Sequence, residues 1–149
     1  MTTTTDTTAP IRIAFVCVQN AGRSQMAIAF AERERDRRDL DGRVDLLTGG
    51  TRPAEHVHDE VIDVMDDTRC DLSDRTPREI MTEELRLCDY VVTMGCSTLD
   101  MGEVGSNVDV RDWALDDPHN QDRQRVREIR DEIEQRVTRL FDEIEEGVS

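Results

Sequence analysis

The sequence predicts an α/β fold in which helices flank a four-stranded parallel sheet. Three short runs rich in apolar residues and one run of alternating apolar and polar residues have the length of strands. Segments with apolar residues at helical spacing alternate with these runs along the chain. This alternation is typical of a parallel sheet whose strands are joined by right-handed crossovers. The 149 residues suffice for one domain with a substantial core, and they contain no internal repeat.

The first half of the chain supplies two strands and two helices. Residues 11–16 (IRIAFV) predict the first strand, and a helix is expected to begin at Ser24. Residues 44–48 predict the second strand, which two glycines follow. Apolar residues at helical spacing over 57–65 predict the second helix.

The second half completes the alternation. A helix start is expected at Thr76, because a Pro at the next position and a Glu three positions later form the pattern of a capping box. Residues 89–94 and 108–113 predict the third and fourth strands. One long amphipathic helix is expected over 123–145, with an apolar stripe that faces the core.

The first ten residues differ in composition from the rest. Residues 1–10 (MTTTTDTTAP) are rich in Thr and low in complexity, so we expect a disordered tail there and a single domain over 11–149. The sequence shows neither a signal-peptide pattern nor an apolar run of membrane-spanning length, which predicts a cytoplasmic protein without a membrane partner.

The formal net charge of −15 indicates which partners the protein can bind and how much salt surrounds it. A nucleic-acid partner is not expected, because phosphate backbones bind surfaces rich in Lys and Arg. The basic residues are 19 Arg and no Lys, and so large an excess of carboxylates repels itself unless salt screens the charges. We interpret this composition as a halophilic surface. An ordinary acidic protein with an Arg bias from a GC-rich genome is the alternative.

The four cysteines do not have the spacing of a metal site. Cys17, Cys70, Cys88 and Cys96 include no C-x-x-C pair, so we expect no zinc and mainly reduced thiols in a cytosol. Cys70 is expected in the core, and Cys88 at the opposite edge of the sheet from Cys17. The segment HVHDE at 56–60 contains metal-ligating residue types, but polar residues at a helix start are the simpler interpretation.

Three chemically reactive segments are expected at one edge of the sheet. In open α/β sheets, functional sites lie beyond the carboxyl ends of the strands. Cys17 ends the first strand, and Cys96 follows the third. Asp116 and Asp117 follow the fourth strand and directly precede Pro118. A carboxylic acid there could protonate a departing oxygen, and a second thiol could attack a sulfur that carries an oxidising adduct.

The turn after the first strand is typical of an oxyanion-binding loop. Its residues are Cys17, Val18, Gln19, Asn20, Ala21, Gly22, Arg23 and Ser24. Backbone N–H groups of such a turn can surround an anion, and the helix that follows adds its positive end. Arg23 can hold two oxygens of a tetrahedral oxyanion, and the same field favours a Cys17 thiolate that acts as a nucleophile.

Three residues are expected to support this loop. Gly22 provides backbone freedom for the tight turn, and Asn20 can form hydrogen bonds from its side chain to the backbone. Ser24 can donate a hydrogen bond to the Cys17 sulfur or cap the helix, and the sequence leaves both roles open.

Three segments resemble those of arsenate reductases built on the low-molecular-weight protein tyrosine phosphatase fold. They are FVCVQNAGRSQMA, DYVVTMGCS and DWALDDP, the last of which is followed by VREIRDEI. This resemblance implies a three-layer fold in which Cys17 is the nucleophile, Arg23 the oxyanion clamp and Asp117 the general acid. It also implies that Cys96 attacks the arsenylated Cys17 sulfur, so that arsenite is released. No bound cofactor is implied, and an external thiol or redoxin supplies the electrons.

One departure from the family pattern leaves the reductant open. Members coupled to thioredoxin usually carry a third cysteine shortly after the second, and residues 97–105 contain none here. The candidates are a low-molecular-weight thiol, a thioredoxin- or glutaredoxin-like protein that attacks a Cys17–Cys96 disulfide, or Cys88.

Hydrolysis of phosphomonoesters, above all of phosphotyrosine, is the alternative function, because phosphate and arsenate share shape and charge. The tyrosine phosphatases of this family tend to carry tyrosines just after the Asp-Pro pair, whereas His119 and Asn120 follow it here. With one Tyr and one Trp, the chain has little to form walls for an aromatic leaving group, which favours arsenate. A non-enzymatic anion sensor is disfavoured because Cys17, Arg23 and Asp117 are all present.

Overall fold

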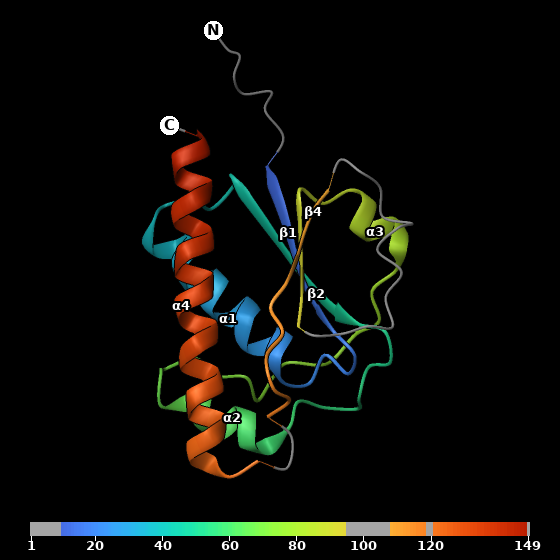
Figure 1. Cartoon of the computed structure of the whole chain (residues 1–149), viewed down its shortest axis with the longest axis vertical. Coiled ribbons are helices and arrows are strands. Elements are labelled where there is room, and N and C mark those ends of the chain that lie inside the picture. The colour runs from blue at the N-terminus through green and yellow to red at the C-terminus, as the bar shows by residue number, and fades with distance from the viewer. Residues whose placement is uncertain (1–9, 95–107, 119–120, 149) are drawn as a thin grey trace, which may run out of the picture.

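Four parallel strands form one sheet in the order β2-β1-β3-β4 (Figure 1). The computed structural model describes residues 10–94, 108–118 and 121–148, so the expected tail falls almost wholly outside the described residues. The strands are β1 (Ile11–Cys17), β2 (Val44–Gly50), β3 (Tyr90–Thr93) and β4 (Asp109–Asp112). The parallel α/β architecture and all four strands are as the sequence predicts. The first two strands extend one and two residues beyond the predicted ends, because both continue to pair up to Cys17 and Gly50.

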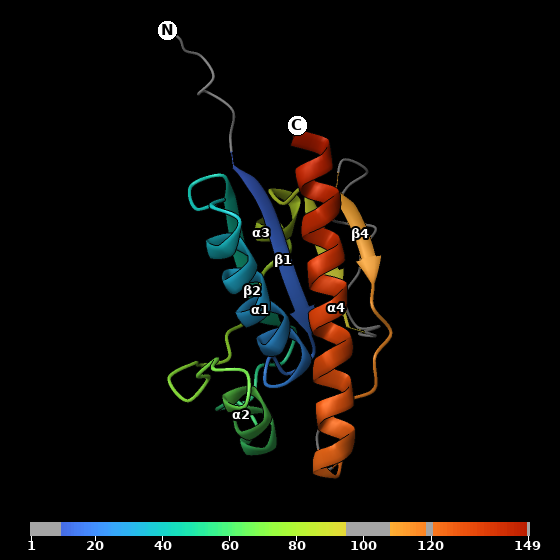
Figure 2. The same cartoon turned by 90° about the vertical axis from the view of Figure 1, so that its left-hand side faces the viewer.

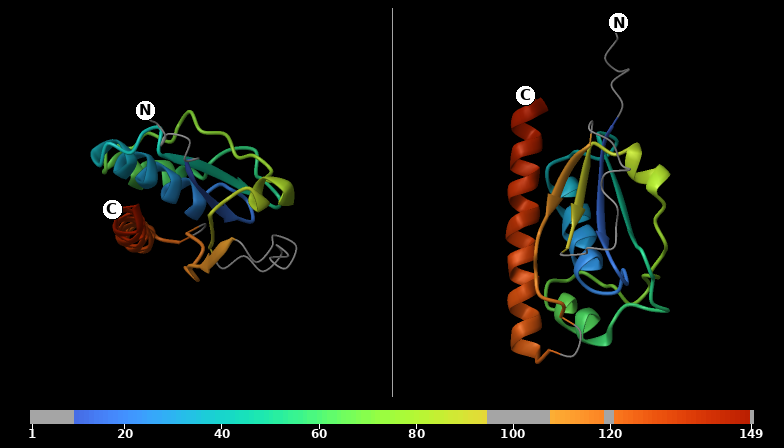
Figure 3. Two further views of the ribbon diagram at one scale, coloured as in Figure 1. Left: turned by 90° about the horizontal axis from the view of Figure 1, so that it is seen from above. Right: turned by 45° about the vertical axis from the view of Figure 1, so that its right-hand side comes forward.

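Helices cover both faces of the sheet, which gives three layers (Figures 2 and 3). The helices are α1 (Arg23–Arg37), α2 (Asp59–Asp66), α3 (Thr82–Arg86) and α4 (Arg123–Val148). Alternate side chains of β1 divide the core between the two faces. Ile13 and Phe15 join a large apolar cluster with α1, α2 and α4, and Ala14 and Val16 join a smaller one with Ile80 and Leu85.

The prediction of a helix that starts at Thr76 is wrong. Residue Glu79 instead forms a parallel bridge with Gly50, and Ile80 is buried in the smaller cluster. The helix begins only at Thr82, where the Glu84 carboxylate accepts a hydrogen bond from the Met81 N–H at 2.8 Å. The segment is extended because it adds backbone hydrogen bonds to the end of β2, and these outweigh a local capping pattern.

Ion pairs between distant helices hold part of the acidic surface together. Arg38, just after α1, lies 3.0 Å from Glu34, 2.9 Å from Asp142 and 2.6 Å from Glu145. The last two belong to α4, so one guanidinium links both long helices. Among the described residues, no helix is long and apolar enough to cross a membrane.

Candidate active site

The loop between β1 and α1 has its carbonyl groups directed outward. The five carbonyls of residues 17–21 each accept a hydrogen bond from a group outside the turn. The bonds are Thr51 N to Cys17 O (3.3 Å), Arg52 N to Val18 O (2.8 Å), Ala54 N to Gln19 O (2.9 Å), the Gln25 side chain to Asn20 O (3.1 Å), and His58 N to Ala21 O (3.0 Å). In a trans peptide, the C=O and the following N–H point in opposite directions. The described peptide bonds include no cis form, so the N–H groups of residues 18–22 point away from these partners.

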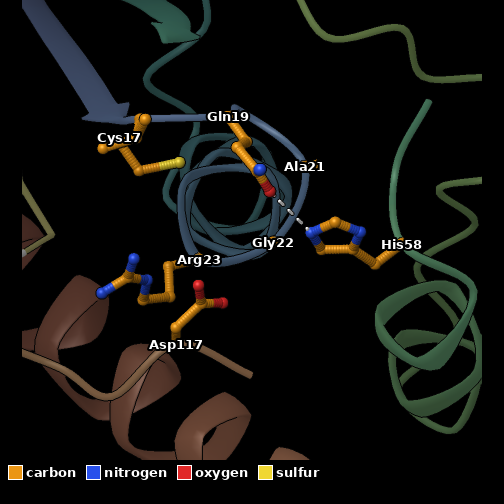
Figure 4. A pocket seen from close by; sticks show the side chains of 8 residues that line it. Cys17, Gln19, Ala21, Gly22, Arg23, His58 and Asp117 are labelled. Carbon is orange, nitrogen blue, oxygen red and sulfur yellow. Dashed lines mark hydrogen bonds between the residues drawn. The ribbon is translucent and has the colours of Figure 1, made fainter. Parts of the chain in front are cut away.

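Beside this loop, at the carboxyl end of β1, lies a pocket of about 250 Å³ (Figure 4). Its lining residues are Cys17, Val18, Gln19, Ala21, Gly22, Arg23, His58 and Asp117. The Asn20 N–H lies 3.2 Å from the Cys17 sulfur. The sequence-predicted loop therefore forms a concave site with a ring of N–H donors, which is the arrangement that binds anions.

The Ser24 hydroxyl forms a hydrogen bond with the Cys17 sulfur, so of the two roles left open by the sequence it has the contact with the sulfur. Its Oγ lies 2.8 Å from the sulfur and accepts a hydrogen bond from the Asn20 side-chain amide at 2.9 Å. When Cys17 is a thiolate, the hydroxyl is the donor of this bond, because a thiolate carries no proton. The N-cap residue of α1 is Gly22, so Ser24 does not cap the helix.

Asn20 is fixed by hydrogen bonds on both sides of its buried amide. Its Nδ2 also donates to Thr48 Oγ1 at 2.9 Å, whose own proton goes to the carbonyl of Phe15. Its Oδ1 accepts the Arg78 N–H at 3.0 Å, which confirms the expected bond from side chain to backbone. These contacts set the orientation of the amide, which donates to the Ser24 hydroxyl.

The backbone of the loop leaves the ordinary α and β regions at Asn20 and, as expected for a residue with backbone freedom, at Gly22, with φ of −141° and ψ of −96°. The left-handed conformation is at Asn20, with φ of 52°, a backbone region that Asn tolerates better than most residues. A Cβ at Gly22 would lie 3.1 Å from the Pro118 side chain. Gly22 therefore leaves room for the segment after β4 rather than adopting a positive φ.

Arg23 connects the loop to the ends of two further strands. Its Nη1 donates to the carbonyl of Met94 at 2.5 Å and to that of Leu115 at 2.6 Å. Met94 directly follows β3 and Leu115 follows β4, so the guanidinium is positioned at the pocket by the sheet edge.

The two neighbouring aspartates are separated by the structure. Asp117 lines the pocket, whereas Asp116 forms an ion pair with Arg125 at the start of α4. Only Asp117 is therefore placed beside Cys17 and Arg23 (Figure 4). Cys96, His119 and Asn120 lie outside the described residues.

Cys88 lies at the opposite edge of the sheet from the pocket, as predicted. The N–H of the next residue, Asp89, bonds to the carbonyl of Arg12, which is five positions before Cys17. At about 3.3 Å per residue, the rise along β1 from Arg12 to Cys17 is roughly 16 Å. Cys88, beside Arg12, is therefore much farther from Cys17 than a disulfide spans. Cys70, predicted to be in the core, is half-buried and packs against the edge of the large cluster.

We predict that Cys88 resists alkylation in the folded protein. Burial raises the pKa of the Cys88 thiol to about 11, and the thiolate is the reactive form. Iodoacetamide at pH 8 is expected to leave Cys88 unmodified, and the rate should rise about tenfold per pH unit below the pKa. Peptide mass mapping measures this, with urea-unfolded protein as the control. Rapid labelling of Cys88 in the folded protein at pH 8 would contradict the prediction.

Sequence reasoning missed three residues that shape the site. Gln25 and His58 supply donors to the loop, and Gly50 lies against it, since a Cβ there would be 2.9 Å from the Cys17 carbonyl oxygen. The two glycines that end β2 were the available signal for a close approach. No group of three potential metal-ligating side chains occurs within the described ranges, and His58 faces the pocket instead.

Residues 12–149 match the sequence profile of the family described as "Low molecular weight phosphotyrosine protein phosphatase". The chain belongs to the low-molecular-weight phosphotyrosine protein phosphatase family. The match covers almost all of the chain, including every described residue of the pocket.

Within this family, the chain is similar to proteins named as arsenate reductases. A Halobacterium salinarum protein named "Putative arsenate reductase" is 65% identical over 124 residues, which are 83% of this chain and 86% of that protein. The solved structure "An arsenate reductase in the phosphate binding state" matches with a TM-score of 0.78 and 27% identity, over 90% of this chain and 98% of that one. A Corynebacterium glutamicum thioredoxin-dependent arsenate reductase matches with a TM-score of 0.76 and 28% identity, over 95% of this chain and 66% of that one.

Proposed function

We propose that residues 11–149 form an arsenate reductase, which reduces arsenate to arsenite through an arsenylated Cys17. The observation that carries this proposal is the pocket, in which N–H donors, Arg23 and Asp117 surround the sulfur of Cys17. The 65% identity to the Halobacterium protein supports arsenate as the substrate. We place the reaction in the cytoplasm, where thiol reductants are available.

In the first step, Cys17 attacks the arsenic atom of bound arsenate. The loop N–H groups and the guanidinium of Arg23 hold the oxyanion, and the Ser24 hydroxyl stabilises the attacking thiolate. A sulfur–arsenic bond forms while one arsenic–oxygen bond breaks. Asp117 donates a proton to the departing oxygen, which leaves as water.

In the second step, the Cys96 thiolate attacks the sulfur of Cys17. A disulfide forms between the two cysteines, and the electrons of the sulfur–arsenic bond pass to arsenic, which leaves as arsenite. An external dithiol, or two molecules of a monothiol, then reduces the disulfide and is itself oxidised to a disulfide. A thioredoxin- or glutaredoxin-like protein or a low-molecular-weight thiol can do this, whereas the distance of Cys88 from Cys17 argues against an internal relay through Cys88. No bound cofactor or metal is part of this scheme.

Phosphomonoester hydrolysis is the alternative function for the same pocket. Phosphate has the shape and charge of arsenate, and water could hydrolyse a cysteinyl-phosphate without a second thiol. The eight residues that line the described pocket include no Phe, Tyr or Trp, so it lacks the walls that an aromatic ester needs. We therefore expect phosphatase activity to be weak.

The deciding experiment measures turnover of arsenate and of para-nitrophenyl phosphate in high salt, with and without redoxins and small thiols. Cys17→Ser is expected to abolish both activities. Cys96→Ser is expected to abolish arsenate reduction and to spare ester cleavage, because only reduction needs a resolving thiol. Cys70→Ser, at a half-buried cysteine on the edge of the core, is the matched control and should change neither. Arsenate reduction that survives Cys96→Ser would contradict the second step, and activity in Cys17→Ser would contradict the mechanism.

A further inference from the structure

A hydrogen bond joins two side chains at the mouth of the pocket that the proposed mechanism does not use. The Nε2–H of His58 donates to Oε1 of Gln19 at 3.2 Å (Figure 4). Gln19 belongs to the oxyanion loop, and His58 directly precedes α2. The pair, which we call the Gln19–His58 bridge, connects two elements across one side of the mouth.

Both ends of the bridge are fixed by the backbone. The carbonyl of Gln19 accepts from Ala54, and the N–H of His58 donates to Ala21. Neither residue can move away without breaking a bond that shapes the loop. The backbone positions that carry the bridge are therefore held by the same bonds that shape the loop.

Two rings approach the loop at Gly22, which lines the pocket. A Cβ at Gly22 would lie 3.7 Å from the imidazole of His58 and 3.1 Å from the side chain of Pro118, so these two rings flank the loop. Asp117 lies beside Pro118 and also lines the pocket. The imidazole therefore lies at Gly22, near the segment that carries the proposed general acid, and lines the pocket.

We propose that the Gln19–His58 bridge is a specificity device that admits inorganic oxyanions and disfavours organic esters. The inference rests on the proposed function, in that a tetrahedral oxyanion binds at Cys17. All atoms of arsenate or phosphate fit inside the ring of N–H donors. An ester has an organic group that extends through the mouth, where it must displace His58 and break the bridge.

The side chain of His58 can be removed without loss of a helix cap. No hydrogen bond from its side chain caps α2, and the bond to Ala21 comes from its backbone. His58→Ala therefore removes the bridge while keeping the backbone contact. His58→Gln keeps a donor for Gln19, and His56→Ala replaces an exposed histidine that does not line the pocket and is the matched control.

The test compares two ligands, inorganic phosphate and phenylphosphonate, by how well each protects Cys17 from alkylation by iodoacetamide. His58→Ala is expected to shift the ratio of the two dissociation constants about fivefold toward phenylphosphonate, the factor that corresponds to one ordinary hydrogen bond. His58→Gln should restore part of the wild-type ratio, and His56→Ala should keep it. A merely structural role for His58 would weaken both ligands alike and leave the ratio unchanged.

The outcomes separate the two proposals. If phosphate protects Cys17 and His58→Ala leaves the ratio unchanged, the specificity role of the bridge is overturned while the oxyanion site stands. The specificity role is also overturned if His56→Ala changes the ratio of the two dissociation constants as much as His58→Ala does. If neither ligand protects Cys17 in the wild-type protein, the oxyanion site itself fails, and the inference that depends on it fails with it.

Discussion

Replacement of Gly50 by alanine is expected to lower arsenate turnover about a hundredfold while the protein stays folded. A Cβ at this position would collide with the carbonyl oxygens of Val18 and Cys17 and lie 3.0 Å from the N–H of Asn20. These are backbone atoms of the oxyanion loop, so the loop must shift as a unit. A displacement of about 1 Å at a reacting group costs on the order of a hundredfold in rate. We expect a stability loss of about 1–3 kcal/mol, as for other overpacked sites.

Gly42 provides the matched control. It has a φ of +86° in the turn before β2, and a Cβ added there would meet no atom within 4 Å, so alanine strains the backbone without touching the loop. Gly42→Ala is expected to destabilise the fold and keep the turnover per folded molecule. Thermal unfolding and steady-state kinetics of both variants make the comparison. Wild-type turnover in Gly50→Ala would show that the close approach to the loop has no role in catalysis.

Replacement of Arg23 by lysine is expected to lower kcat/KM for arsenate by about 10²–10³, although the positive charge is kept. One Nη atom of Arg23 already holds the carbonyls of Met94 and Leu115. The remaining N–H groups of the planar guanidinium can then contact the oxyanion in the proposed mechanism. A lysine has a single nitrogen, which cannot serve both sets of acceptors in that geometry. The magnitude is that of losing one preorganised donor to a developing oxyanion.

Steady-state kinetics with arsenate and protection of Cys17 by phosphate test this prediction. Arg37→Lys is the matched control, because Arg37 belongs to the same helix and its side chain is 61% exposed. We expect Arg37→Lys to retain wild-type kinetics. If Arg23→Lys also retains them, charge alone suffices and the forked geometry is not needed.

The fold could be predicted from the sequence because its signals are local. Three strands coincide with runs rich in apolar residues, β4 coincides with an alternating segment, and the spacing in α4 marks a buried stripe, so these local patterns identify the alternation of strands and helices. The prediction of a helix that starts at Thr76 was wrong because it also relied on a local signal. A capping pattern reports what a segment can do in isolation, whereas Glu79 and Ile80 are held extended by β2 and the smaller core.

For the candidate site, too, the sequence predicts the residues that local signals mark and misses those that depend on tertiary contacts. Cys17 and Arg23 could be located because both lie in one turn, and Asp117 because it follows a strand at the same sheet edge. The residue types alone do not separate Asp117 from Asp116, and only the family resemblance singles out Asp117. In the structure Asp117 lines the pocket, whereas Asp116 forms an ion pair with Arg125. The roles of His58 and Gln25 could not be predicted, because they depend on which carbonyl each one meets.

By itself, the sequence determined the parallel α/β architecture and the chemistry gathered at its carboxyl edge. Both follow from the order of apolar runs and from the residues that end them. The tertiary structure alone decided that the loop is preorganised to bind an anion. The carbonyls of Cys17, Val18 and Ala21 are turned outward by donors more than thirty positions away in the chain. Such partners are chosen by packing, because a backbone N–H is the same in every residue except proline and leaves no mark in the sequence.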